Sequence, residues 1–229
     1  MNEKLDIVKS EYKAMQDLKG IWNNPMVQFI ISNIPCISTI STIVDGSIQY
    51  LIDERQKKKM EELLETVFLD SSITLDDLYD VDHIMEFAKV MDVVNHLIRN
   101  DKVKYFGKLL KSTIHSGNKN IDEFEELLNK LNELSLREID LLFLLAETEK
   151  NHIIKDSNNN DTIDYTKSWK DFVEKVKDEY DMNETEIDSS MLGIMRTGFC
   201  MSDWNFSFSK AGLVMYTTPS YKILLDKIY

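Results

Sequence analysis

The chain has 229 residues, of which 43% are hydrophobic, and only 7 are Gly and 3 are Pro. This length is enough for one large or two small hydrophobic cores, and the scarcity of chain breakers predicts long, uninterrupted helices. The formal net charge of −13 works against non-specific binding to DNA or to anionic lipid, since both are negatively charged.

The two cysteines, Cys36 and Cys200, are far apart in the sequence and belong to no CxxC motif or Cys/His cluster. This excludes a disulfide framework and predicts free thiols in a reducing compartment. Acidic and basic residues are interleaved through residues 1–12, which excludes the hydrophobic core of a signal peptide. We therefore expect a cytoplasmic protein.

The first 72 residues are predicted to form a helical hairpin region. An apolar stripe predicts an amphipathic helix over residues 3–19. Residues 20–44 contain no charged residue, and that length by itself would suggest a transmembrane segment. Two prolines and many Asn, Ser and Thr residues interrupt the segment, which favours a buried hairpin. The alternative is a segment that inserts into a membrane after a conformational change.

A further helix is predicted from residue 37 to about residue 68. Its middle, residues 53–59, is polar on all sides, which fits either one long helix emerging into solvent or two helices meeting there. The lysines at residues 57–59 are interpreted as a solvated face.

An acidic region follows. Residues 61–100 hold ten Asp or Glu against only Lys89 and Arg99, and the acidic segment 70–82 is the predicted boundary between residues 1–72 and a helical body over residues 73–134. Apolar periodicity predicts the helices of this body over residues 81–99, 102–115 and 121–131, the last of them capped by Asn120.

The most apolar helix is predicted over residues 135–150. Ser135 and Glu138 have the spacing of a capping box, and the run from Leu141 to Ala146 is apolar on all sides, so we expect this helix at the centre of the main core. A polar, asparagine-rich surface loop is predicted next, over residues 151–166. Helices follow over residues 168–180 and 187–196, where Asn183 and Glu186 match a cap and Gly198 ends the second helix.

The C-terminal part changes character. Residues 199–204 and 213–217 are rich in β-forming residues and predict a hairpin, and Thr218 followed by Pro219 predicts the start of a last helix. Three helices, a β-hairpin and a helix are the order of a winged helix. The predicted fold class is therefore mainly α, a helical bundle with a C-terminal winged-helix-like module over residues 135–229 that contains one short β-hairpin.

In such a module, residues 184–196 would form the helix that enters a DNA major groove. They carry Glu184, Glu186 and Asp188 against Arg196 alone, whereas phosphate contacts require positive charge. Residues 191–229 have four Lys or Arg against two Asp, a net charge of +2. The charge of the helix favours protein contact over DNA binding, with candidate partner-binding residues Arg196, Trp204 and Lys210.

A row of lysines gives the second set of candidate partner-binding residues. Lys104, Lys108 and Lys111 lie on one face of the predicted helix 102–115 and could bind a phosphate or an acidic partner. They could equally form a solvated face or pair with the acidic region 61–92 of the same or another copy.

Two other patterns fall short of a site. Residues 156–167 place oxygen-bearing side chains at several EF-hand positions, but Asp161 stands in place of the glycine and Lys167 in place of the bidentate glutamate, so a plain polar loop is predicted. Asp92 and His96 are one helical turn apart, without a second histidine in reach or a nearby nucleophile. No catalytic or nucleotide-binding motif is present, and we expect no enzyme activity, no cofactor and no metal site.

One stretch resembles a known family. The features that carry the resemblance are VKYFGKLLKSTI with Tyr105–Leu110, the helix start Leu134–Glu138, Trp169, and the segment from Gly198-Phe199 to Thr217. Together these segments, over about residues 103–217, resemble the bacterial abortive-infection alpha (Abi-alpha) family. The resemblance implies a cytoplasmic helical protein of bacterial phage defence, and it carries over no catalytic residues.

The sequence thus predicts a non-enzymatic interaction or regulatory protein, with a phage-defence role implied by the resemblance. Its expected partners are another protein or further copies of itself, since amphipathic stripes occur without a catalytic site. Two alternatives stay open: a membrane-perturbing effector that uses residues 20–44, and a DNA-binding winged-helix regulator.

Overall fold

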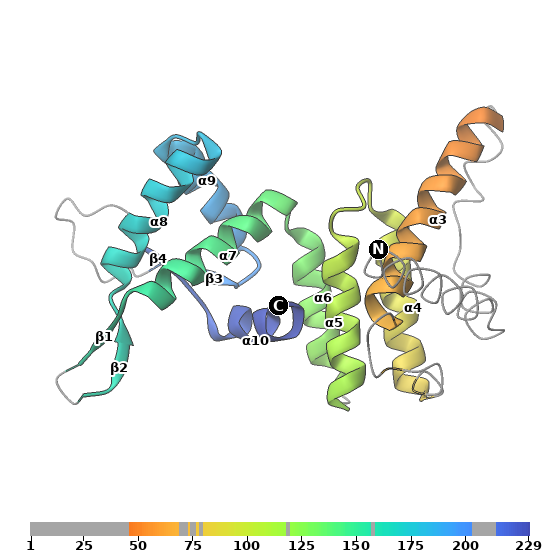
Figure 1. Cartoon of the computed structure of the whole chain (residues 1–229), viewed down its shortest axis with the longest axis horizontal. Helices are drawn as coiled ribbons and strands as arrows, with labels where there is room; N and C mark the ends of the chain where they lie inside the picture. The colour runs from red at the N-terminus through yellow and green to blue at the C-terminus, as the bar shows by residue number, and fades with distance from the viewer. Residues whose placement is uncertain are drawn as a thin grey trace, which may run out of the picture. The chain divides into compact units, whose positions relative to one another are not determined.

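The computed structural model describes residues 46–68, 73, 77, 80–117, 120–156, 159–202 and 214–229. The chain divides into two compact units, one of residues 1–128 with 227–229 and the other of residues 129–226. The described residues are mainly helical (Figure 1), which confirms the predicted fold class. The predicted helix over residues 3–19 and the uncharged segment 20–44 lie outside the described residues.

In the first unit, α3 (Gly46–Phe68) packs against α4 (Val81–His96) and α5 (Val103–Ser116). The fully buried side chains of this core come from all three helices and include Leu63, Phe87 and Phe106. Helices α3 and α5 approach closely at Gly107, where a Cβ would lie only 2.8 Å from the Thr66 side chain. A glycine is therefore needed at this crossing.

Helix α3 continues without a break through residues 53–59, which decides between the two alternatives left open for that stretch. The prediction of a solvated lysine face was correct for Lys57 and Lys58, which are exposed, and wrong for Lys59, which is buried. Lys59 is one turn before Leu63 and therefore shares the core-facing side of α3.

Helix α6 (Ile121–Glu133) begins after Asn120, whose Oδ1 accepts the Glu123 N–H at 3.2 Å, as expected of the predicted cap. The second unit then follows the predicted order of a winged helix: α7 (Leu136–Asn151), α8 (Tyr165–Tyr180), α9 (Glu184–Met195), the antiparallel strands β3 (Cys200–Ser202) and β4 (Met215–Thr217), and α10 (Pro219–Ile228). In the hairpin, Cys200 is opposite Thr217 and Ser202 is opposite Met215.

The helix starts of this unit confirm the predicted caps. Ser135 and Asn183 each form a full capping box, with Glu138 and Glu186 respectively. Thr218 Oγ1 accepts the N–H of Tyr221 at 3.3 Å at the start of α10. Helix α7 is buried along Leu141, Leu142, Leu144 and Leu145, so the predicted central helix does lie in the core of this unit.

One prediction for this unit was wrong. Residues 151–166 are not a plain loop, because they contain a second hairpin of β1 (Ile153–Lys155) and β2 (Asp161–Ile163). The β-branched residues Ile153 and Ile163 face each other across the strands, and such residues favour extended structure. The turn is closed by Asp156, whose Oδ1 accepts the Asn160 N–H at 2.8 Å.

Among the described helices, none combines the length and the apolar character needed to cross a membrane.

Candidate functional site

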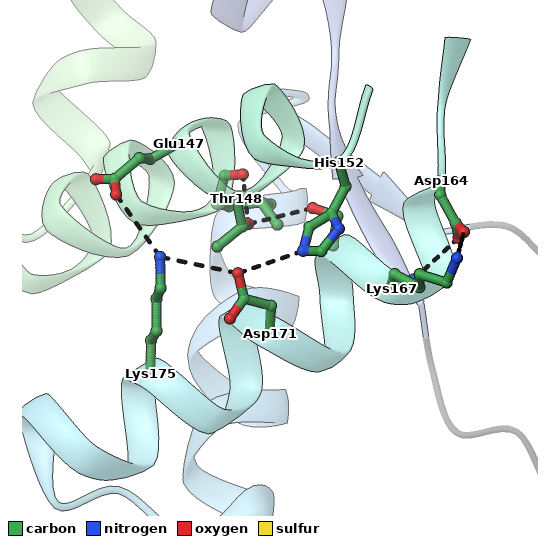
Figure 2. A network of polar contacts seen from close by, with 9 residues as sticks. Glu147, Thr148, His152, Asp164, Lys167, Asp171 and Lys175 are labelled. Carbon is green, nitrogen blue, oxygen red and sulfur yellow. Dashed lines mark hydrogen bonds and ion pairs between the residues drawn. The ribbon is translucent and has the colours of Figure 1, made fainter. Parts of the chain in front are cut away.

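A cluster of charged side chains joins the end of α7 to α8, as Figure 2 shows. Lys175 Nζ lies 3.6 Å from Glu147 Oε1 and 3.8 Å from Asp171 Oδ2, and the same Asp171 oxygen lies 3.4 Å from Nε2 of His152. His152 is the C-cap residue of α7. The carboxylate of Asp171 on α8 therefore contacts both the end of α7 and the neighbouring lysine of its own helix.

Two buried hydroxyls connect the same helices. Ser168 Oγ donates to Thr148 Oγ1 at 3.2 Å, and Thr148 Oγ1 donates to the Leu145 carbonyl at 2.8 Å (Figure 2). At the start of α8, Asp164 accepts the backbone N–H of Lys167 at 3.1 Å and lies 3.0 Å from its ammonium. These bonds from Lys167 lower the pKa of the Asp164 carboxyl.

This arrangement positions α8 against α7 and contains no evident reaction centre. A histidine and a carboxylate activate a nucleophile only when the nucleophile is within hydrogen-bond reach. The hydroxyls of Thr148 and Ser168 are instead buried and bonded to each other. In the described part of the chain, no group of three or more His, Cys, Asp or Glu side chains could hold a metal ion.

The end of α7 is also attached, through a buried carboxylate, to the hairpin of strands β3 and β4, which we call the wing hairpin. Glu149 is 2% exposed, and it accepts the N–H of Thr217 at 2.6 Å and the hydroxyl of Thr217 at 2.5 Å. Burial raises the pKa of Glu149, although both bonds from Thr217 act in the opposite direction. Opposite Thr217, burial and then the nearby Glu149 raise the pKa of the Cys200 thiol to about 12, so this cysteine is not a reactive nucleophile.

The surface of α9 is the surface that a winged helix would present to DNA. Its exposed residues are Glu184, Thr185, Glu186, Asp188, Ser189 and Leu192. Arg196, the predicted partner-binding residue at its end, donates from Nη2 to the Glu133 carbonyl at 2.8 Å, and its Nε lies 3.7 Å from Glu133 Oε2. The cation of this segment is therefore already engaged within the chain.

The predicted lysine row lies on α5. Lys104 and Lys108 are exposed and Lys111 is half-buried. Lys104 Nζ lies 4.9 Å from the centre of the Tyr105 ring, and Lys104 is close enough to Glu62 to influence its pKa. None of the three lysines forms an ion pair with another described residue, including the described acids of residues 61–92. Trp204 and Lys210, the other two candidates, lie outside the described residues.

Two groups with structural roles were missed by the sequence analysis. Lys59 donates its ammonium hydrogens to the carbonyls of Val94, Asn95 and Leu97 at 3.4, 3.5 and 2.5 Å, at the C-terminal end of α4. Burial, and then the charge of Arg55, lower the pKa of Lys59. Lys59 and Glu149 each lie three or four residues from apolar residues on the buried face of their helix. This spacing was the sequence signal that could have predicted their burial.

The remaining patterns form no site. Asp92 and His96 lie on the surface of α4, where His96 Nδ1 is 2.7 Å from the Asp92 carbonyl oxygen and 3.7 Å from Asp92 Oδ1. The described residues of the stretch that partly matches the EF-hand pattern include strand β2 and the start of α8, where the Lys167 ammonium lies 3.0 Å from Asp164.

No protein family model, curated protein or solved structure matches this chain. Its function therefore has to be inferred from its own residues.

Proposed function

We propose that this chain is a non-enzymatic regulatory protein that acts through protein–protein contacts and associates with copies of itself. The observation that carries this proposal is the acidic exposed face of α9. The nearby Arg196 is held by Glu133, and Lys177 of α8 is paired with Glu184. A helix that reads DNA places its N-terminal residues against the base edges of the major groove, between the two phosphate backbones. Exposed carboxylates at that end of the helix therefore repel the duplex.

The same face suits contact with a protein. Leu192 is 55% exposed near the end of α9, on the same face as the exposed Asp188 and Ser189. A large apolar side chain inside a polar rim is the pattern of a small protein-binding surface. Protein partners with basic rims would match its charge.

Two measurements separate protein contact from DNA binding. In light scattering, the mean mass of the purified chain is expected to rise with concentration. In a gel-shift assay at low salt, where phosphate contacts are strongest, a random duplex is expected to remain unshifted. A strictly monomeric chain would refute the self-association. A duplex shift that weakens with salt would favour the DNA-binding regulator instead.

A cytoplasmic role in bacterial phage defence is part of this proposal, and the resemblance of residues 103–217 to the Abi-alpha family supports it. The test is phage plating on a bacterial host that expresses the chain, compared with a host that carries a stop codon at residue 5. We expect fewer plaques on the expressing host. Equal plaque counts across a panel of unrelated phages would remove this part of the proposal.

A further inference from the structure

Helix α5 carries an unusual surface for so acidic a chain. Its sequence, VKYFGKLLKSTIHS, contains three lysines and no acidic residue, in a protein with 40 Asp or Glu against 27 Lys or Arg. Lys104, Lys108 and Lys111 follow one another at i, i+4 and i+7 and therefore lie on one helix face, within about 10 Å along the axis. We call them the lysine row.

Helix α8 and its C-cap carry the opposite surface. Glu174, Asp178 and Asp181 have the same spacing of i, i+4 and i+7, and all three are exposed. None of their side chains forms an ion pair or hydrogen bond with another described residue. We call them the acid row.

The two lysines nearest to the acid row do not neutralise it. Lys175 is held by Glu147 and Asp171, and Lys177 is paired with Glu184 at 2.5 Å. The internal ion pairs of α8 thus engage both of these lysines. Lys170, one turn before Glu174, is exposed and forms no ion pair with the row among the described residues. The lysine row is likewise without ion-pair partners among the described residues.

We propose that the lysine row of one copy binds the acid row of a second copy. This inference rests on the proposed self-association and names its contact. Glu174 and Asp178 are one turn apart on α8, as Lys104 and Lys108 are on α5, and Asp181 lies just beyond the end of α8. Two helix faces with opposite charges at equal spacing can align ion pairs along one line, and such complementarity selects the partner and its register. Because the contact joins different surfaces of the two copies, it is heterologous and can also extend beyond a dimer.

Charge-swapped chains test the pairing directly. One variant carries Lys108→Glu and Lys111→Glu, and the other carries Glu174→Lys and Asp178→Lys. Lys104 is left unchanged because it lies near Glu62, and Asp181 because its backbone is left-handed, with φ 52°. A control with Lys58→Glu and Lys150→Glu makes the same change in net charge as the first variant, at exposed residues outside the rows.

The expected result is reciprocal. In size-exclusion chromatography with light scattering at low salt, each swapped variant alone associates at least about tenfold more weakly than the wild type, because like charges then face each other. An equimolar mixture of the two variants regains association, and the control variant behaves as the wild type. Circular dichroism checks that each variant is folded. If a double variant is unfolded, the single variants Lys108→Glu and Asp178→Lys replace the two double variants in the same test.

Three results would overturn the pairing. They are association that is insensitive to both variants, association lost equally in the control, and a mixture that does not regain association. In each of these cases the wild type still associates, so the proposed function stands while the inferred contact fails. A wild type that is monomeric at every concentration refutes both.

Discussion

Replacing the buried carboxylate of Glu149 tests how the wing hairpin is held to α7. Its oxygens accept the N–H and the hydroxyl of Thr217 at 2.6 and 2.5 Å in a site where Glu149 is 2% exposed. Glu149→Ala leaves both donors buried without this acceptor. A hydrogen bond to a charged group contributes about 1.5–3 kcal/mol, and losing two of them is partly offset because a buried charge is also removed.

The expected net loss for Glu149→Ala is about 2–4 kcal/mol in the free energy of unfolding. Glu149→Gln is the matched control, since its amide oxygen still accepts one bond from Thr217 and it carries no charge. Because burial raises the pKa of Glu149, the fold disfavours the charged form, and we expect Glu149→Gln to be within about 1 kcal/mol of the wild type at neutral pH.

The pH dependence has a defined sign. The folded-state pKa of Glu149 is raised above its unfolded value, so between these two values the folded chain binds more protons than the unfolded chain. This contribution to stability is fully present below the unfolded pKa and is lost as the pH rises through the folded pKa. Glu149→Gln is expected to remove this part of the pH dependence.

Urea unfolding followed by tryptophan fluorescence is the assay. A Trp22→Phe background removes the tryptophan of the first unit. The remaining fluorescence then comes from tryptophans of the second unit, which include the buried Trp169. The Ala variant should lower the midpoint by about 1–2 M urea. Equal losses for Ala and Gln, or no loss for Ala, would refute the reasoning that the buried bonds to Thr217 hold the hairpin.

Three further predictions concern single residues. Lys59→Ala removes the ammonium that donates to the carbonyls at the end of α4 and should cost about 1–3 kcal/mol. Faster hydrogen exchange of the last amides of α4 would report this loss, and unchanged exchange would contradict it. Cys200, with a pKa raised to about 12, should react with a thiol reagent in a Cys36→Ser background only as fast as the second unit unfolds, so rapid labelling of the native protein would be contrary evidence. Ser135→Ala breaks the capping box of α7 and should cost about 1 kcal/mol in urea unfolding, whereas Ser189→Ala, an exposed serine within α9, should change stability by less than about 0.5 kcal/mol.

Local patterns in the sequence predicted much of the second unit. The capping boxes at Ser135 and Asn183, the strands on either side of residues 203–213 and the start of α10 at Pro219 were all expected and are confirmed. Each of these signals depends on residues within a few positions of one another, where caps and turns are decided. The order of the elements then followed directly from the sequence.

Contacts between distant residues were not predicted. Lys59 belongs to a run of three lysines, and its burial depends on the end of α4 lying beside it, 35 to 38 residues later. Glu149 meets Thr217 across 68 residues. The β1–β2 hairpin was missed because a short pair of strands inside an asparagine-rich stretch gives a weak periodic signal.

The candidate partner-binding residues were only partly placed. The lysine row was expected on one face of α5, and its members lie there. The hydrogen bond from Arg196 to the Glu133 carbonyl could not be foreseen, because the two residues are 63 positions apart. The acid row was overlooked, since its significance depends on Lys175 and Lys177 being engaged elsewhere.

Sedimentation velocity of the full chain at low salt, in one cell with a duplex labelled at a separate wavelength, tests the proposed mode of action most directly. Action through protein contacts predicts a protein boundary that moves faster as the chain concentration rises, while the duplex sediments as free DNA. A protein boundary that does not change with concentration, together with a duplex that sediments with the protein, would contradict it.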